Sequence, residues 1–189
     1  MDILAKLFGG AVKVKLMRLF LLNSDLVLSS KEVSKRIKAP AVTTSRELGK
    51  LANIDLLHKT RRASSTFWRL DPTFPFNNQL RQILKNNLLG YKRDLARKFG
   101  TCGRLYLLVM SGIFIDQADS RADLLIVGSQ MKRGAVDRLV KKFEAEIGKE
   151  LTYALLETTE FKYRLDACDK FIRDVLDFPH EIVIDKIGL

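Results

Sequence analysis

A proline at position 40 stands between two stretches that each have the spacing of an amphipathic helix. The first stretch, residues 29–37, begins with Ser29 and carries Glu32 three residues later, which is the pattern of a capping box. Pro40 disfavours helical geometry at the residue before it and suits the start of a new helix, which then covers residues 41–53. One long helix is therefore excluded, and the sequence predicts two helices joined by a tight turn.

The segments on either side of these helices extend the pattern. An amphipathic stretch at residues 11–23 precedes them. Two β-prone runs, residues 56–62 and 66–70, follow them and flank a short polar tip at residues 63–65. Helix, helix, turn, helix and hairpin, in this order, are typical of a winged helix-turn-helix domain.

The helix expected at residues 41–53 has two faces of different character. Ala41, Thr44, Leu48 and Leu51 have the spacing of a buried stripe. The opposite face is small and polar with two basic residues, which suits a helix that enters the major groove of DNA. Hydroxyl groups can bond phosphates or base edges, arginine can reach guanine, and a valine methyl can meet a thymine methyl. The candidate DNA contacts on this helix are Val42, Thr43, Ser45, Arg46 and Lys50.

Positive charge is concentrated in the same part of the chain. Residues 1–85 contain 16 Lys and Arg against 6 Asp and Glu, whereas residues 86–189 contain 17 against 16. Lys59, Arg61 and Arg62 crowd the first strand of the hairpin, where a wing would meet a phosphate backbone. A basic hairpin can also be a solvated surface, and helix-turn-helix folds also serve in protein contacts. We expect double-stranded DNA as the partner.

The charge asymmetry and the change in pattern suggest two domains. Residues 1–85 form the winged helix-turn-helix domain with a connecting helix, and residues 86–189 form the second domain. In the second domain, strands are expected at 104–110, 123–128, 151–156 and 181–185, with a loop between the first two and helices between the others. The expected fold class is α/β, or α+β overall, with a small mixed sheet flanked by helices.

The stretch 105–128 resembles the minimal nucleotidyltransferase domain of the polymerase-beta superfamily. The family pattern is a strand, a Gly-Ser turn, a loop, an Asp-x-Asp pair at the next strand and a third carboxylate on a later strand. The resemblance implies two Mg²⁺ ions held by three carboxylates, with phosphates at the turn. Here the turn reads Ser111-Gly112, Arg121 replaces the first aspartate, and Asp123 matches the second.

The third carboxylate is missing from the expected strand at 151–156, and Glu150 and Glu157 lie just outside it. One carboxylate of three cannot assemble a two-metal centre, so the chemistry implied by the resemblance is expected to be lost. Asp116 or Asp119 could replace a ligand only from a loop. We therefore expect no catalytic residue, no metal and no cofactor, and a salt bridge from Arg121 to Asp123 or Asp119.

The whole layout is similar to ArsR-type winged-helix proteins that carry such a second domain, a group of prokaryotic transcriptional regulators. The resemblance implies a DNA-binding regulator that acts as a homodimer. Its second domain would dimerise, bind a nucleotide without turning it over, or bind another protein. The alternatives are a nucleotidyltransferase tethered to nucleic acid and an antitoxin-like interaction protein.

Two further observations bear on the setting of the protein. No apolar run reaches the ~20 residues of a membrane span, since lysines and an arginine interrupt residues 3–22. Cys102 and Cys168 match neither a metal site nor a disulfide framework. We expect a reducing cytoplasm and no membrane partner.

Overall fold

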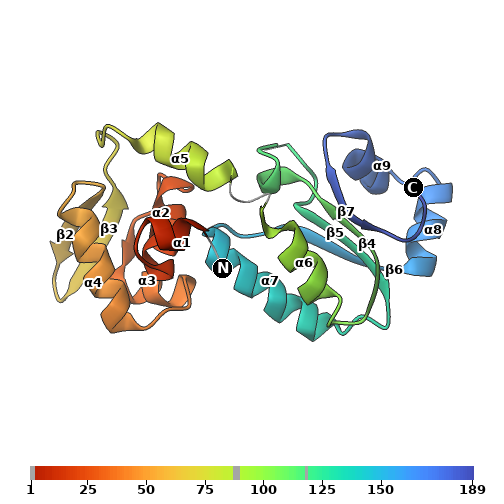
Figure 1. The fold of residues 1–189 in the computed structure, drawn as a ribbon, viewed down its shortest axis with the longest axis horizontal. Coiled ribbons are helices and arrows are strands. Elements are labelled where there is room, and N and C mark those ends of the chain that lie inside the picture. The colour runs from red at the N-terminus through yellow and green to blue at the C-terminus, as the bar shows by residue number, and fades with distance from the viewer. Residues whose placement is uncertain (1–2, 87–89, 118) are drawn as a thin grey trace. The chain divides into compact units, whose positions relative to one another are not determined.

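A computed structural model describes residues 3–86, 90–117 and 119–189 of the chain. The fold divides into two compact units, and each unit contains two separate segments of sequence (Figure 1). The first unit comprises residues 1–84 and 142–150, and the second comprises residues 85–141 and 151–189. The sequence had indicated domains at 1–85 and 86–189, so the observed units assign residues 142–150 differently.

Helices make up most of the first unit, and their boundaries follow local signals. Ser29 caps the third helix, and its backbone N–H donates to the Glu32 carboxylate at 2.7 Å, as the capping box predicts. The chain leaves this helix through Lys38, whose φ is +50°, and Pro40 is the N-cap of the next helix. The helices of this unit are α1 (Ile3–Leu7), α2 (Ala11–Leu21), α3 (Ser30–Arg36), α4 (Ala41–Ala52) and α5 (Asn77–Asn86).

A three-stranded antiparallel sheet completes this unit, with strand order β1-β3-β2. Strand β1 contains only Leu28 and Ser29. Strands β2 (Leu57–Arg62) and β3 (Ser65–Leu70) form the predicted hairpin, and their turn contains only Ala63 and Ser64. Trp68 of β3 is 4% exposed and donates its indole N–H to Ser30 at 2.8 Å. The hairpin is thereby fixed to the start of α3.

A four-stranded mixed sheet is the centre of the second unit, with strand order β6-β5-β4-β7. The central pair, β4 (Arg104–Met110) and β5 (Leu124–Ser129), is antiparallel. Strand β6 (Tyr153–Glu157) runs parallel to β5, and β7 (Glu181–Asp185) runs antiparallel to β4. The α+β class expected from the sequence is confirmed, as is the strand at 181–185.

Helices cover both faces of this sheet (Figure 1). Phe161 of α8 and Ile172 of α9 pack with Leu107, Val109 and neighbouring residues of β5 on one face. Helix α6 and the first part of α7 lie on the other face. The bounds are α6 (Lys92–Phe99), α7 (Arg133–Ile147), α8 (Thr158–Asp166) and α9 (Lys170–Asp177). Leu88 and Leu89, which continue the apolar spacing of Leu80 and Leu84 in the sequence, lie outside the described residues.

The last turns of α7 belong to the first unit, where side chains of α2 and the loop after it contact them. Arg18 is fully buried and donates to the carbonyl of Glu146 at 3.0 Å. Asn23 donates to the carbonyl of Gly148 at 2.7 Å. Gly148 has a φ of +79°, and a Cβ there would lie 2.6 Å from the backbone nitrogen of Leu19. Two side chains therefore satisfy carbonyls that the end of a helix leaves open.

Within the part of the chain that the structure describes, no helix is both long and apolar enough to cross a membrane.

Replacing Gly148 with alanine is expected to lower the free energy of unfolding of the first unit by roughly 2–3 kcal/mol. The added methyl group would meet the backbone of α2, and a non-glycine residue is strained at this φ. Urea unfolding followed by the fluorescence of Trp68, the one tryptophan of the chain, measures this unit. Gly134→Ala is the matched control, because its Cβ has room early in α7 and alanine favours a helix. Equal stability of the two variants would contradict the close packing.

Candidate functional site

Helix α4 presents the face that the sequence singled out. Val42 is 84% exposed, and the side chains of Arg46 and Lys50 are 67% and 54% exposed. Ser45 is exposed and Thr43 is half-buried. The opposite side contains the buried residues Thr44, Leu48 and Leu51, as predicted. Ala41 was expected in the buried stripe, but it is exposed because it occupies the first turn, beyond the packed part of the helix.

A buried carboxylate lies between the two cations of α4, and the sequence pattern gave no sign of it. Glu47 is 7% exposed, and one of its carboxylate oxygens accepts from Lys50 at 2.8 Å. Arg46 lies 3.5 Å from the same oxygen, and Lys13 of α2 lies 3.9 Å from the other. The hydrogen bond from Lys50, with the three nearby charges, holds the pKa of Glu47 below its usual range. The carboxylate orients Arg46 and Lys50 at the edge of the exposed face.

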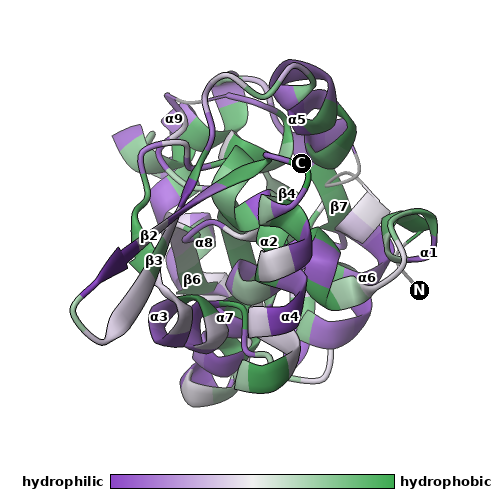
Figure 2. Ribbon diagram, turned by 90° about the vertical axis from the view of Figure 1, so that its left-hand side faces the viewer, coloured by the Kyte–Doolittle hydropathy of each residue, from purple (hydrophilic) through white to green (hydrophobic). Residues whose placement is uncertain are grey.

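The hairpin carries its basic residues on both sides. Lys59, Arg61 and Arg62 are all exposed, as the sequence predicted for a wing. The Lys59 ammonium lies 5.6 Å from the centre of the Trp68 ring, and the Arg62 guanidinium lies 5.9 Å from that of Phe67. These cation–π contacts restrict two of the three side chains. Figure 2 shows the hydrophilic character of β2 where the hairpin extends from the unit.

A depression between α3 and the start of α4 adds residues that the sequence reasoning missed. Its volume is about 670 Å³. Three lysines and three serines line it, together with two alanines, and no carboxylate is among its lining residues. The N-terminus of α4 has no side-chain cap, so its backbone N–H groups favour an anion there. The lining residues are Ser30, Lys31, Ser34, Lys35, Lys38, Ala39, Ala41 and Ser45.

The spacing of the three lysines could have revealed them. Lys31 and Lys35 are four residues apart, and Lys38 follows three residues later, so the spacing places them on one side of α3 and its exit. Among the described residues, none of the three has a carboxylate within ion-pair distance, and the same holds for Arg61. In contrast, three of the four cations of α6 are paired, since Lys92 contacts Glu181 and both Arg97 and Lys98 contact Asp94. Around α4, unneutralised charge is therefore present at α3, at its exit and on the hairpin.

The second candidate site, at the end of β4, contains a carboxylate whose two oxygens both accept hydrogen bonds from the backbone. Asp123 is 8% exposed. One of its carboxylate oxygens accepts from the N–H of Ile113 at 2.8 Å, and the other accepts from the N–H of Thr152 at 2.8 Å. Gly112 has a φ of +56°, and a Cβ there would overlap the Asp123 carboxylate. The Ser111 hydroxyl donates to the carbonyl of Ala122 at 2.5 Å. The aspartate thus joins the turn after β4 to the start of β6.

The other charged groups considered for this site lie elsewhere. Arg121 pairs with Asp174 of α9 at 2.9 Å, so the expected pairing with Asp123 or Asp119 is wrong. This partner could not be predicted from sequence patterns, because Asp174 lies 53 residues after Arg121. Glu157 lies opposite Gly128 in the pairing of β5 with β6, at the far end of β5 from Asp123. Glu150 forms an ion pair with Arg36 in the first unit. In the described part of the chain, no three His, Cys, Asp or Glu residues are grouped to hold a metal ion.

Comparison of the chain with protein-family models, with curated proteins and with solved structures finds no match.

Asp123→Asn is expected to destabilise the second unit by roughly 2–3 kcal/mol. The amide can accept only one of the two backbone hydrogen bonds, and its NH₂ group faces the N–H donor of the other. Urea unfolding followed by circular dichroism in the presence of EDTA measures the loss. Asp119→Asn is the control, because Asp119 is exposed. A metal ligand would cost nothing when no metal is present, so an unchanged midpoint in EDTA would contradict the structural role.

Proposed function

We propose that this protein is a DNA-binding transcriptional regulator that acts as a dimer. The observation that carries the proposal is the arrangement of charge in the first unit. An exposed helix face, a lysine-lined depression at the N-terminus of that helix and a basic hairpin all belong to one helix-turn-helix arrangement. The unpaired cations of this unit favour a polyanion as the partner.

In this function, α4 enters the major groove with its N-terminal half. Twelve residues give the helix about three turns and a length of about 18 Å, and the groove, about 12 Å wide, admits an α-helix. Arg46 reaches a guanine edge and Val42 meets a thymine methyl, while Thr43 and Ser45 bond phosphates or bases. Because Arg46 is 67% exposed, it can leave Glu47 without breaking a buried contact.

Phosphate contacts come from the surrounding cations. Lys31, Lys35 and Lys38 line the depression beside the start of α4 and suit the backbone of one strand. Lys59, Arg61 and Arg62 suit the backbone next to the wing, with Lys50 at the other end of α4. One such unit covers few base pairs, so selectivity requires a second copy of the chain.

The second unit is proposed to bind a ligand or a partner, or to dimerise, without nucleotidyl transfer. Asp123, which matches the second carboxylate of the family pattern, accepts two backbone hydrogen bonds within its own fold. Arg121 stands where the pattern has the first carboxylate, and it pairs with Asp174. These contacts support a structural role for residues that would otherwise bind metal.

Selection from a pool of random duplexes at two salt concentrations tests the proposed function. Enrichment of a palindromic motif is the expected result, because a symmetric dimer reads two related half-sites. Salt-sensitive binding without enrichment would overturn sequence-specific regulation, and absence of binding would overturn DNA as the partner.

Arg46→Ala is expected to weaken binding to the selected duplex by about 1–3 kcal/mol and to relax the preference at one base pair. Fluorescence anisotropy with the selected duplex and with single-base variants of it measures both effects. Lys162→Ala, which removes an exposed charge from α8, is the control. If Arg46→Ala and the control bind alike, α4 does not read the bases through this residue.

The double variant Lys35→Ala/Arg61→Ala is expected to weaken binding to every duplex alike. Each side chain neutralises about one phosphate, so the slope of log K against log salt should fall by about two units. Neither side chain has an ion pair or an aromatic contact among the described residues, so the fold should be unaffected. Titrations at four salt concentrations measure the slope. An unchanged slope would show that Lys35 in the depression and Arg61 on the wing do not contact the phosphates of DNA.

A further inference from the structure

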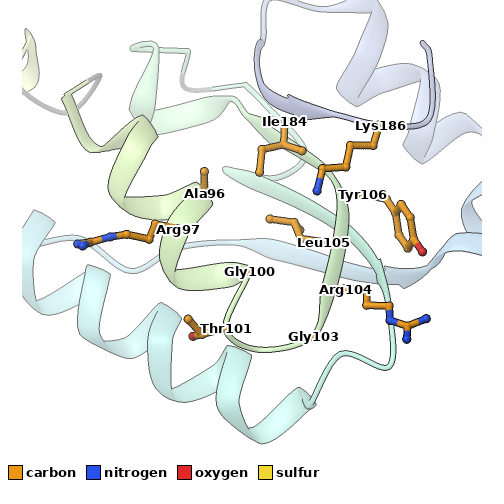
Figure 3. A pocket seen from close by; sticks show the side chains of 10 residues that line it. All are labelled: Ala96, Arg97, Gly100, Thr101, Gly103, Arg104, Leu105, Tyr106, Ile184 and Lys186. Carbon is orange, nitrogen blue, oxygen red and sulfur yellow. The ribbon is translucent and has the colours of Figure 1, made fainter.

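A cavity opens in the second unit at the start of β4, away from the turn that contains Asp123. Its volume is about 580 Å³, within the range of small-molecule sites. Residues of α6, of the connection from α6 to β4, and of β4 and β7 line it, and Figure 3 shows their side chains. The lining residues are Ala96, Arg97, Gly100, Thr101, Gly103, Arg104, Leu105, Tyr106, Ile184 and Lys186.

Close backbone packing fixes one wall of this cavity. A Cβ at Gly103 would lie 2.7 Å from the carbonyl oxygen of Gln130, so only glycine allows this approach. The carbonyl of Cys102 accepts from the N–H of Lys132 at 2.9 Å. The connection between α6 and β4 is therefore held against the segment that follows β5. The wall exists before any ligand arrives.

The charge lining the cavity is positive, and two of its three cations lack an acidic partner in the described part of the chain. Arg104 and Lys186 have no carboxylate within ion-pair distance among the described residues, and the Lys186 ammonium points into the cavity (Figure 3). The nearest acidic residue in sequence, Asp185, accepts the backbone N–H groups of residues 187–189 at 2.8–3.0 Å. These bonds lower the pKa of Asp185 and keep its carboxylate on the C-terminal turn. Arg97, the third cation, pairs with Asp94.

The rest of the lining offers a ring, a hydroxyl and apolar side chains. The pairing of β4 with β5 shifts register between Leu105 and Leu107, so Tyr106 is the bulged residue. The carbonyl of Tyr106 accepts from the N–H of Lys186 at 2.8 Å, so the two residues lie side by side in the lining of the cavity. Leu105 and Ile184 supply apolar surface, and Thr101 supplies a hydroxyl.

We propose that this cavity binds a small organic phosphate that carries a flat ring, such as a nucleoside monophosphate. The phosphate lies against the Lys186 ammonium, which points into the cavity and whose charge no carboxylate among the described residues offsets (Figure 3). The ring packs beside Tyr106, Leu105 and Ile184. The site is separate from the Ser111-Gly112 turn, which follows the other end of β4. The inference concerns the second unit alone and holds whether or not the first unit binds DNA.

Isothermal titration calorimetry of the full chain with adenosine monophosphate tests the site, with adenosine and inorganic phosphate as comparison ligands. Saturable binding of one adenosine monophosphate per chain is expected, at least tenfold tighter than either comparison ligand. Lys186→Gln should raise the dissociation constant at least fivefold. Lys170→Gln, an exposed lysine of α9, is the matched control and should leave it unchanged.

Each other outcome overturns the proposal in a distinct way. If adenosine binds as tightly as adenosine monophosphate, the site does not recognise the phosphate. If inorganic phosphate binds as tightly as adenosine monophosphate, the site does not recognise the ring. Because a nucleotide could also bind the basic surface of the first unit, Lys35→Ala/Arg61→Ala is titrated as well. A loss of adenosine monophosphate binding in that variant, with Lys186→Gln unaffected, would move the site to the DNA-binding surface. No saturable binding at millimolar concentration would overturn the site itself.

Discussion

The end of helix α7 is held by α2 and the loop after it, and much of the fold follows from this contact. The last carbonyls of a helix have no partner within the helix, and cations are favoured there. Arg18 and Asn23 supply donors to Glu146 and Gly148, residues that lie more than 120 positions later in the chain. Lys15 adds an ion pair to Glu146 at 2.9 Å. A fully buried arginine is costly without such partners, so the core of the first unit requires the segment 142–150.

The cations of the first unit divide into two groups with different tasks. Lys13, Lys15 and Arg18 of α2 point to Glu47 or to the end of α7, and they stabilise the fold. Within the described residues, no carboxylate pairs with the cations of the hairpin or with Lys31, Lys35 and Lys38 of α3 and its exit. Charges that the fold does not neutralise repel one another, so their retention on one side of a helix-turn-helix arrangement favours an external polyanion. Net charge alone does not make this distinction, because it counts both groups equally.

Local signals predicted a large part of this architecture. The capping box at Ser29, the break at Pro40 and the alternation of β2 and β3 each act within a few residues, and each element formed where expected. The exposed face of α4 was also predicted, because helical spacing acts over the same short range. Burial of Glu47 could not be predicted, because it depends on Lys13 from another helix. Likewise, Arg121 pairs with a residue of α9, and Arg18 depends on α7. Periodicity assigns a side chain to a face, but it does not name the partner that a distant segment brings to that face.

The two ends of strand β4 lie in very different environments. After its last residue, Asp123 accepts two backbone hydrogen bonds, and Gly112 leaves no room for even a Cβ beside the carboxylate. A metal ion there would have to displace N–H donors that join two segments of the unit, and buried donors left without acceptors are costly. At its start, β4 carries a bulge, an unpaired arginine and a phenol that border open space. A charged ligand can enter that end without breaking any hydrogen bond of the fold. Ligand recognition in the second unit is therefore more consistent with the start of β4 than with the turn that resembles a transferase site.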